Sequence, residues 1–382
     1  MSETDHSLLA ASQDDLPAFT ADLGRLVELE TPSSDTSLLA TGLDEIEAWL
    51  VECLGAPRER NRWDGGDQGD ILEVRYPGTS TTEVLLVGHY DTVWPQGTLD
   101  TWPVRVEDDH FSGPGCLDMK AGLVQGVRAV RMLRDRGLDH PSVRFLFNGD
   151  EEIGSPASRP HIERASATAA ATLVLEASAG GRVKVSRKGM GIFTVTTHGV
   201  ESHAGLDPSA GASAVHALAE IIPALVRTAA PERGTTVNVG VVRGGTARNV
   251  VAGEASCDVD VRVSEPEEMS RIDAAFAELS TPDPRVKLVV DGNWNRPPMN
   301  PNPASEELLA HVRAAAADVG RELGTTAVGG ASDANFVSAL DRAVVCGLGA
   351  VGAGPHARHE HIVLSETAAQ TAQLAQLLHR LA

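Results

Sequence analysis

Apolar residues form three short runs in the first half of the chain, and each run ends in polar or charged side chains. The runs are EVLLVGHYD at residues 83–91, SVRFLFNGDEE at 142–152 and ATLVLEAS at 171–178. Short apolar runs of this kind are typical of buried strands. Segments with helical spacing of apolar residues lie around them, near 16–30, 40–54, 119–136 and 159–166. Strands and helices therefore alternate as in an α/β domain.

The order of elements changes after Gly180 and Gly181, which mark a break in this pattern. Four strands are predicted at residues 191–198, 235–243, 255–263 and 286–290. Two helices are interleaved with them, one with its apolar face at Leu218, Ile221, Ile222 and Leu225 and one near 265–279. This β-α-β-β-α-β order is typical of a ferredoxin-like sandwich.

Two domains are expected, because 382 residues exceed what one hydrophobic core usually supports. The Pro- and Asn-rich segment 291–303 is predicted to return the chain to the first domain, where a last leucine-rich helix covers the sheet. We therefore predict an α/β domain with a mixed central sheet flanked by helices, formed by residues 1–182 and 295–382. An α+β ferredoxin-like domain is predicted to be inserted at residues 183–294.

Composition excludes some classes of partner. The chain has 53 acidic against 32 basic residues and a formal net charge of -21, which disfavours nucleic acid and anionic membrane surfaces. Its four cysteines lack metal or disulfide spacing, which suits a reducing compartment. The N-terminal segment shows no secretory pattern, and no run approaches ~20 apolar residues. A cytoplasmic location is therefore expected.

His89 and Asp91, at the end of the first apolar run, are candidates for a metal ligand and the carboxylate that orients it. An imidazole that binds metal usually needs an acceptor behind it to fix its tautomer and orientation. For this motif taken alone, the alternative is a solvated strand end with a stray histidine.

More candidate ligands follow along the chain. Asp118 lies in a Gly-rich turn that opens a helix, and Glu176 ends the third apolar run. Asp150, Glu151 and Glu152 are adjacent acids, which repel one another unless cations share them. A solvated acidic loop is the alternative for these three, although the apolar strand before them favours a site. The segment 352–365 then supplies His356, His359, Glu360 and His361.

Such a set of ligands suits two divalent cations that share one carboxylate and one water. Two cations about 3.5 to 4 Å apart polarise a carbonyl group and stabilise the oxyanion that forms. Zinc accepts histidine and carboxylate ligands and lowers the pKa of water, but a base must still move the proton to the leaving amine. Glu152 is expected to bind metal while its neighbour Glu151 faces the water.

Taken in order, five motifs resemble the dinuclear zinc peptidase family that contains aminoacylases, acetylornithine and succinyl-diaminopimelate deacylases, and carboxypeptidase G. The motifs are His89-x-Asp91, Gly-Pro-Gly-x-x-Asp118-x-Lys120-x-Gly122, Asp150-Glu151-Glu152-x-Gly154-Ser155, Glu176 and His356-x-x-x-Glu360. The resemblance covers nearly the whole chain. Within the family, DTVWPQGTLDTWPVRVE is most similar to the carboxypeptidase G branch, which releases C-terminal glutamate from acylated or pteroyl substrates.

The resemblance implies a role for each motif. Two Zn²⁺ ions per chain, with Co²⁺ or Mn²⁺ as substitutes, would be held by His89, Asp118, Glu152, Glu176 and His356. Asp118 would bridge the two ions, Asp91 would orient His89, and Glu151 would be the general base and acid. His356 is preferred to His359 and His361 because His-x-x-x-Glu is the family spacing.

The resemblance also implies that the inserted domain is a lid and dimerises. Its turn from Gly199 to Gly205 would place His203 in the partner's active site, where it would stabilise the oxyanion. Asn249 and Arg262 would contact the substrate carbonyl and the terminal carboxylate. From the residues alone, a solvated loop is the commoner interpretation of a histidine such as His203, whereas Arg262 is equally compatible with a strand-surface charge.

The Gly-rich loop at residues 328–336 is a further candidate for substrate binding. Backbone amides near Gly330 and Ser332 could hold a substrate carboxylate, as the family's similar loop does. A plain connecting loop is the alternative.

The sequence therefore predicts a metal-dependent hydrolase, glutamate carboxypeptidase-like, that cleaves the amide between an acyl or peptidyl group and a C-terminal amino acid. One alternative is an N-acyl amino acid deacylase of the acetylornithine deacetylase or succinyl-diaminopimelate desuccinylase type. A non-catalytic, dimeric peptide-binding relative is the alternative from another class. The expected partners are small acyl-amino acids or peptides and a second copy of the chain, without nucleic acid or membrane.

Overall fold

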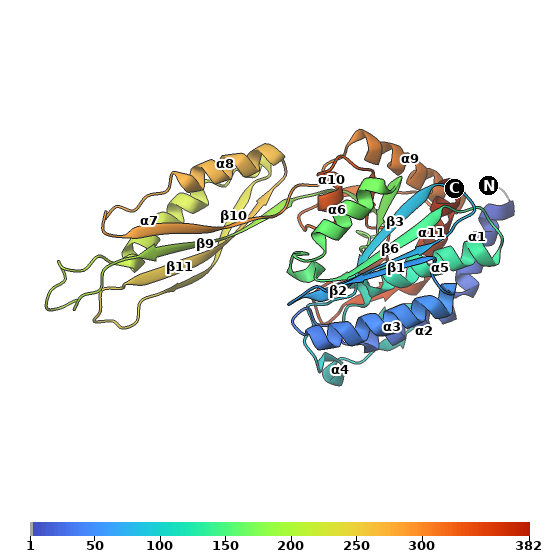
Figure 1. The fold of residues 1–382 in the computed structure, drawn as a ribbon, viewed down its shortest axis with the longest axis horizontal. Helices are drawn as coiled ribbons and strands as arrows, with labels where there is room; N and C mark the ends of the chain where they lie inside the picture. Colours follow the sequence, from blue (N-terminus) through green and yellow to red (C-terminus); the bar gives the residue numbers. More distant parts are fainter. Residues whose placement is uncertain (1–2) are drawn as a thin grey trace. The chain divides into compact units, whose positions relative to one another are not determined.

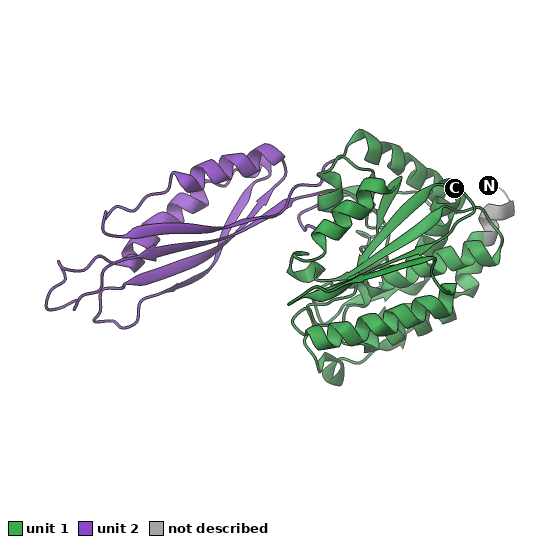
Figure 2. Ribbon diagram, in the orientation of Figure 1, with its two compact units in different colours: residues 1–186, 301–327, 332–382 green, residues 187–300, 328–331 purple. Residues whose placement is uncertain are grey.

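Residues 183–187, which the sequence analysis included in the inserted domain, form a strand of the larger sheet. The computed structural model describes residues 3–382 and divides the chain into two units (Figure 2). Unit 2 contains residues 187–300 and 328–331, and unit 1 contains the rest. The predicted domain boundaries, after residues 182 and 294, lie a few residues before the boundaries of the two units, after residues 186 and 300. The first one differs because β8 (Val183–Arg187) pairs with β14 (Val344–Cys346) in the sheet of unit 1.

Unit 1 is built on an eight-stranded sheet with the order β1-β2-β6-β3-β7-β14-β8-β13. Its other strands are β1 (Glu59–Trp63), β2 (Gly69–Tyr76), β3 (Glu83–His89), β6 (Ser142–Gly149), β7 (Ala171–Val174) and β13 (Thr325–Val328). β3 pairs in parallel with β6 and β7, and β7 pairs in parallel with β14. β1, β2 and β8 pair antiparallel. The sheet is mixed, as predicted, and the three apolar runs form its parallel centre.

Helices cover both faces of this sheet, so its central strands are buried. In β3 every residue from Val84 to His89 is buried. α3 and α5 lie on one face and α6 on the other (Figure 1). The helices of unit 1 are α1 (Glu3–Asp14), α2 (Leu16–Glu28), α3 (Thr36–Leu54), α4 (Thr98–Thr101), α5 (Ala121–Asp135), α6 (Arg159–Thr168), α9 (Pro303–Asp318), α10 (Ala334–Ser338) and α11 (Leu364–Arg380). No helix within residues 3–382 has the length and apolar character needed to cross a membrane.

A second, four-stranded sheet in unit 1 carries the C-terminal histidine motif. Its order is β15-β16-β5-β4, formed by β15 (Gly352–Ala353), β16 (His361–Val363), β5 (His110–Ser112) and β4 (Arg105–Glu107). The loop between β15 and β16 contains His356 and Glu360. Because β16 pairs with β5, this loop is brought close to the segment that leads into the short helix η1 (Cys116–Lys120).

Unit 2 has the ferredoxin-like order that the sequence predicts. Its elements are β9 (Gly189–His198), α7 (Ala214–Arg227), η3 (Pro231–Arg233), β10 (Thr236–Gly244), β11 (Glu254–Val263), α8 (Pro266–Ala277) and β12 (Lys287–Arg296). The antiparallel sheet has the order β10-β11-β9-β12. Side chains from its strands and both helices, among them Val195, Val259, Leu218 and Phe276, form a core of their own. The predicted α/β fold with an inserted α+β domain is confirmed.

Helix α5 begins in close contact with the end of β7. A Cβ atom at Gly122 would lie 1.9 Å from the backbone oxygen of Leu175, a contact that no rotation of a side chain relieves. Gly122 therefore lets the helix entrance approach the strand ends, and the residues on both sides of this contact, Asp118 and Glu176, are candidate ligands.

Replacing Gly122 with Ala is expected to destabilise the chain by about 2 kcal/mol, because the helix must move away from the strand. Urea or thermal unfolding measures the effect. Gly24→Ala, in α2, is the matched control: apart from its chain neighbours and the backbone of its own helix, no atom lies within 4 Å of the added methyl group, so stability should rise by roughly 0.5 to 1 kcal/mol. Equal effects of the two substitutions would contradict this account of the close contact.

Candidate metal centre

Parallel pairing of three strands brings the predicted ligands of the first half of the chain to one edge of the sheet. His89 is the last residue of β3 and lies opposite Asn148 of β6. The short helix η2 (Glu151–Ile153) follows β6 directly, and Glu176 follows β7 by two residues. Since parallel strands end at the same edge, ligands at their carboxyl ends converge, as in open α/β sheets generally.

Asp118 lies between two histidines that come from distant parts of the chain. Its Oδ1 is 3.3 Å from Nε2 of His89, and its Oδ2 is 3.3 Å from Nε2 of His356. Each carboxylate oxygen therefore faces a different imidazole, the arrangement that a carboxylate shared by two cations requires.

Each of the two histidines also lies near a second carboxylate. Glu176 Oε1 lies 3.9 Å from Nε2 of His89, and Glu152 Oε2 lies 3.1 Å from Nε2 of His356. Possible ligand atoms of His89, Asp118 and Glu152 all lie within 4.8 Å of one another. In the part of the chain that the structure describes, the buried Oε1 of Glu152 has no hydrogen-bond partner. The donor set therefore fits divalent cations.

Glu151 lies close to the His89 side of this cluster. Possible ligand atoms of Glu151, His89 and Glu176 also lie within 4.8 Å of one another. All five predicted ligands and the predicted base are thus gathered at one place in unit 1.

The two histidines and their carboxylates perturb one another strongly. Burial by itself lowers the pKa of His89, but hydrogen bonds to Asp118 and Asp91 outweigh it and raise that pKa well above its usual value. Hydrogen bonds to Asp118 and Glu152 raise the pKa of His356 to about 10. Burial raises the pKa of Asp118, yet both histidines hold that pKa well below its usual range. Protonated imidazoles thus neutralise the carboxylates, and binding cations would displace these protons.

Asp91 is fully buried behind His89 and holds more than that imidazole. Its Oδ1 is 3.3 Å from Nδ1 of His89, which also lies 3.0 Å from the backbone oxygen of Asp91. The backbone amides of Glu151 and Glu152 donate to its carboxylate at 3.2 Å, and the hydroxyl of Ser33 donates at 2.8 Å. Asp91 therefore fixes both His89 and the turn that carries the next two acids.

The three adjacent acids have different surroundings. Asp150 is fully buried, and its Oδ2 accepts hydrogen bonds from the amides of Ala157 and Ser158 at 2.8 and 3.0 Å. Its side chain holds the loop that leads into α6, whereas Glu151 and Glu152 belong to the ligand cluster. One of the three acids therefore holds backbone, and the other two face the cluster of candidate ligands.

Of the three C-terminal histidines, the structure brings only His356 to the described ligand cluster. The ring of His361 lies next to that of His110, with centroids 5.0 Å apart. Nδ1 of His361 lies 2.9 Å from the backbone oxygen of His359. The choice of His356 from its spacing to Glu360 agrees with this geometry.

Sequence analysis missed two lysines beside the ligands. Nζ of Lys184 lies 3.8 Å from Oε2 of Glu176. Lys120 is buried and donates to the backbone oxygens of Leu26 and Leu29 at 2.9 and 2.8 Å, and burial lowers its pKa to about 7. No periodicity signals either contact, although Lys120 stands in one of the five motifs.

In unit 2, His203 and Asn249 are neighbours near one end of the sheet. The backbone oxygen of Asn249 accepts a hydrogen bond from the amide of Ala204. Nδ1 of the exposed His203 accepts hydrogen bonds from the amides of Gly205 and Leu206, both at 3.1 Å. A neutral His203 therefore carries its proton on Nε2, where the ring can donate to another group.

Arg262 lies at the other end of β11, and its guanidinium is paired with Asp260. Its Nε and Nη2 both donate to that carboxylate at 2.9 Å. The pairing agrees with the alternative of a strand-surface charge, and Asp260 is the signal that could have shown it, because residues two apart on a strand share a face.

In the candidate loop at residues 328–336, Ser332 makes a hydrogen bond within the loop. Ser332 is fully buried, and its amide donates to Oδ1 of Asn335 at 2.9 Å. The backbone oxygen of Gly330 accepts a hydrogen bond from Arg187. The amide of Ser332 is thus engaged inside the loop, and the role of Gly330 stays a prediction.

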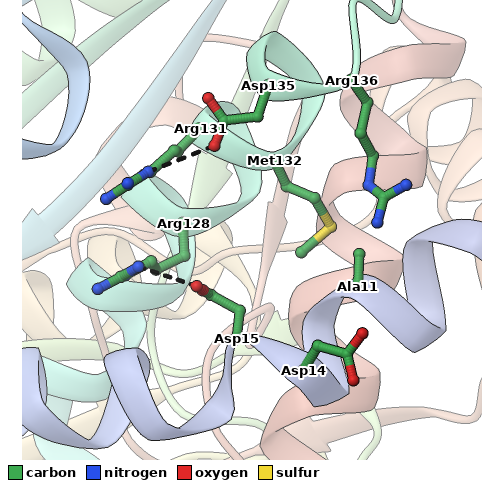
Figure 3. Close-up of a pocket in the computed structure, with 8 residues that line it drawn as sticks. All are labelled: Ala11, Asp14, Asp15, Arg128, Arg131, Met132, Asp135 and Arg136. Carbon is green, nitrogen blue, oxygen red and sulfur yellow. Dashed lines mark hydrogen bonds and ion pairs between the residues drawn. The ribbon is translucent and has the colours of Figure 1, made fainter.

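A cavity of about 480 Å³ lies between α1 and α5, lined by none of the predicted site residues (Figure 3). Arg128, on α5, is buried beside it and donates to Asp15 at 3.0 Å and to Asp22 at 2.5 Å. These ion pairs tie the start of α2 to α5, so this cavity is bordered by structural contacts.

Comparison with known proteins gives matches along nearly the whole chain. The model of peptidase family M20/M25/M40 matches residues 85–380. Carboxypeptidase G2 of Pseudomonas sp. (strain RS-16) is 28% identical over 383 residues, covering 98% of this chain and 92% of that protein. A succinyl-diaminopimelate desuccinylase of Methylobacterium nodulans is 27% identical, covering 79% and 81%. The structure of aminopeptidase PepT from Bacillus cereus superimposes with a TM-score of 0.79 at 22% identity, covering 96% and 98%.

Titration of the metal-free chain with Co²⁺ is expected to reach about two equivalents, because Asp118 offers one oxygen to each side. His356→Ala should weaken one equivalent by more than the roughly 10- to 100-fold that loss of an outer partner costs. His359→Ala is the matched control and should leave both equivalents unchanged. Similar losses in the two variants would contradict the assignment of His356.

Proposed function

The chain belongs to peptidase family M20/M25/M40 and is a metal-dependent amide hydrolase, and we propose that it uses two zinc ions to release C-terminal glutamate from acyl or peptidyl substrates. One observation carries the two-ion part: the oxygens of Asp118 face two different histidines, each accompanied by another carboxylate. The glutamate preference rests on the similarity to carboxypeptidase G2, which extends over 92% of that protein.

Bound divalent cations would polarise the substrate carbonyl and make water more acidic. The chain's own residues then supply orientation and proton transfer. Glu151, next to His89 and Glu176, takes a proton from the attacking water and gives it to the nitrogen of the leaving amino acid. Asp91 holds the amide of Glu151 and the ring of His89 at once, so base and ligand keep a fixed separation.

Glu151→Gln is expected to lower kcat by at least ~10²- to 10⁴-fold, because the amide cannot accept the proton. Metal content should stay near two equivalents per chain, since the proposed base is not a ligand. Glu307→Gln, at an exposed glutamate of α9, is the matched control and should retain full activity. Hydrolysis assays with metal analysis separate the outcomes, and full activity of the Glu151 variant would overturn this mechanism.

The nearest alternative substrate class is an N-acyl amino acid with an acetyl or succinyl group, which the similarity to a desuccinylase supports. Both reactions use the same centre, so substrates must separate them. A panel on metal-loaded protein is expected to show release of free glutamate from N-acyl and pteroyl glutamates as the faster reaction. Faster release of acetate or succinate from other N-acyl amino acids would favour the deacylase.

Within unit 2, the placement of His203 and Arg262 supports a homodimer. The His203 turn adjoins residues 249–253, just before the start of β11, whereas Arg262 is the next-to-last residue of that strand. The strand alone separates the two by roughly 27 Å at ~3.4 Å per residue. In its proposed role Arg262 exchanges Asp260 for the carboxylate of a substrate in its own copy, and one small substrate cannot contact both Arg262 and His203 of that copy. His203 therefore acts on the partner's substrate, where its Nε2 proton stabilises the oxyanion.

Mixing two inactive variants tests this arrangement. His203→Ala lacks the donor and Glu151→Gln lacks the base, so each homodimer should be nearly inactive. After subunits exchange at random, half of the dimers are mixed, and each mixed dimer has one complete site. Activity is therefore expected to recover to about a quarter of the wild-type value. No recovery on verified mixing would show that His203 acts within its own copy or not at all.

A further inference from the structure

Glu360 is a fully buried carboxylate that accepts four hydrogen bonds. Its Oε1 accepts from the amides of Leu117 and Asp118 at 2.8 and 3.0 Å. Its Oε2 accepts from the amide of Gly115 at 3.1 Å and from Nε1 of Trp94 at 3.2 Å. Three backbone amides of one short turn and one indole therefore converge on a single side chain.

These four donors are neutral, so no opposite charge explains why a carboxylate is buried here. Burial of a charged group is costly unless its oxygens are well satisfied, and burial raises the pKa of Glu360. A carboxylate can accept at both oxygens at once, whereas an amide side chain offers one acceptor and one donor. A turn with three amides pointing the same way needs an acceptor at each position.

The turn that Glu360 holds is the one that presents Asp118. Gly115 has a φ of 71°, a conformation that favours glycine and bends the chain so that the following amides face Glu360. Because the amide of Asp118 itself is bound, its side chain leaves the backbone from a fixed point. Its two oxygens can then lie 3.3 Å from His89 and from His356.

Glu360 also connects the other two sides of the cluster. It lies in the loop that carries His356, and its own amide donates to Ala357 in that loop at 2.8 Å. Trp94 follows His89 in the segment after β3 and packs against Trp102, with ring centroids 5.0 Å apart. One carboxylate is thus in contact with all three segments that supply His89, Asp118 and His356.

We propose that Glu360 is the positioning residue of the shared carboxylate Asp118, and that it sets the affinity of the centre for its second cation. The second cation is the one that needs Asp118 and His356 together, and Glu360 serves both, because it lies in the loop of His356 and binds the backbone amide of Asp118. The inference rests on the proposed two-ion function, but its test measures binding rather than turnover.

The Glu360→Gln variant tests this proposal. Its metal-free chain is titrated with Co²⁺, and the visible absorption of the bound Co²⁺ is measured. The amide NH₂ must face two N–H donors whichever way it turns, so two of the four hydrogen bonds are lost. The second equivalent should bind roughly 10- to 100-fold more weakly, with a changed d–d spectrum, while the first equivalent is little affected. Wild-type affinity for both equivalents would overturn the proposal, even if the variant melts earlier.

Two further variants separate positioning from general stability. Glu268→Gln replaces a buried glutamate of unit 2 that accepts from Thr235 and Arg271, so it should lower the melting temperature without changing Co²⁺ binding. Trp94→Phe removes one donor and keeps the carboxylate, so the second equivalent should weaken by less than about tenfold. A Glu268 variant that loses Co²⁺ affinity as Glu360→Gln does would also overturn the proposal.

If Glu360→Gln does not fold, Glu360→Asp takes its place. Aspartate keeps the charge, but it is one methylene shorter and cannot reach the Asp118 turn and Trp94 together. Selective loss of the second Co²⁺ supports the proposal, and unchanged binding contradicts it. Should the wild-type chain itself bind fewer than two Co²⁺ ions, the two-ion function fails instead, which is a different result.

Discussion

Repulsion between carboxylates gathered in one buried place is the constraint on which the arrangement of unit 1 depends. Asp118, Glu152 and Glu176 face the same small region, and each lies within 4 Å of His89 or His356. Two more buried acids lie behind this cluster, and each accepts hydrogen bonds from backbone amides: Asp91 from the amides of residues 151 and 152, and Glu360 from three amides of residues 115–118. The chain thus uses inward-pointing acids to hold the turns that present the ligands.

Each of the two sheets of unit 1 brings a different part of these groups together. The parallel centre of the large sheet aligns the ends of β3, β6 and β7, which places His89, the acidic turn and Glu176 at one edge. The small sheet contributes by pairing β16 with β5, so the loop with His356 lies next to the Asp118 turn. Close packing at Gly122, where a methyl group would meet the Leu175 backbone, completes the approach.

Most of the fold and of the ligand set could be predicted because both follow from local patterns. Apolar runs identified the strands, and acids placed directly after them identified ligands at a shared edge. Contacts between segments far apart in the sequence could not be predicted. The sequence analysis used Glu360 only to identify the spacing of His356, and it gave no sign that Lys184 lies near Glu176. The pairing of β8 with β14, which spans some 160 residues, could not be predicted either, because β8 is short. The domain boundaries and the roles of the site residues stay predictions.

The pairing of β16 with β5 has a consequence for the order of events during synthesis. Residues 110–112 leave the ribosome long before residues 361–363, to which they pair, and contacts of such large sequence separation form late. Asp118 therefore stays without His356 and without its turn-holding acid until nearly the whole chain has been made. A nascent or truncated chain can collect His89, Glu152 and Glu176 but lacks His356 and Glu360, so the predicted ligand set is complete only in one of the last steps of synthesis.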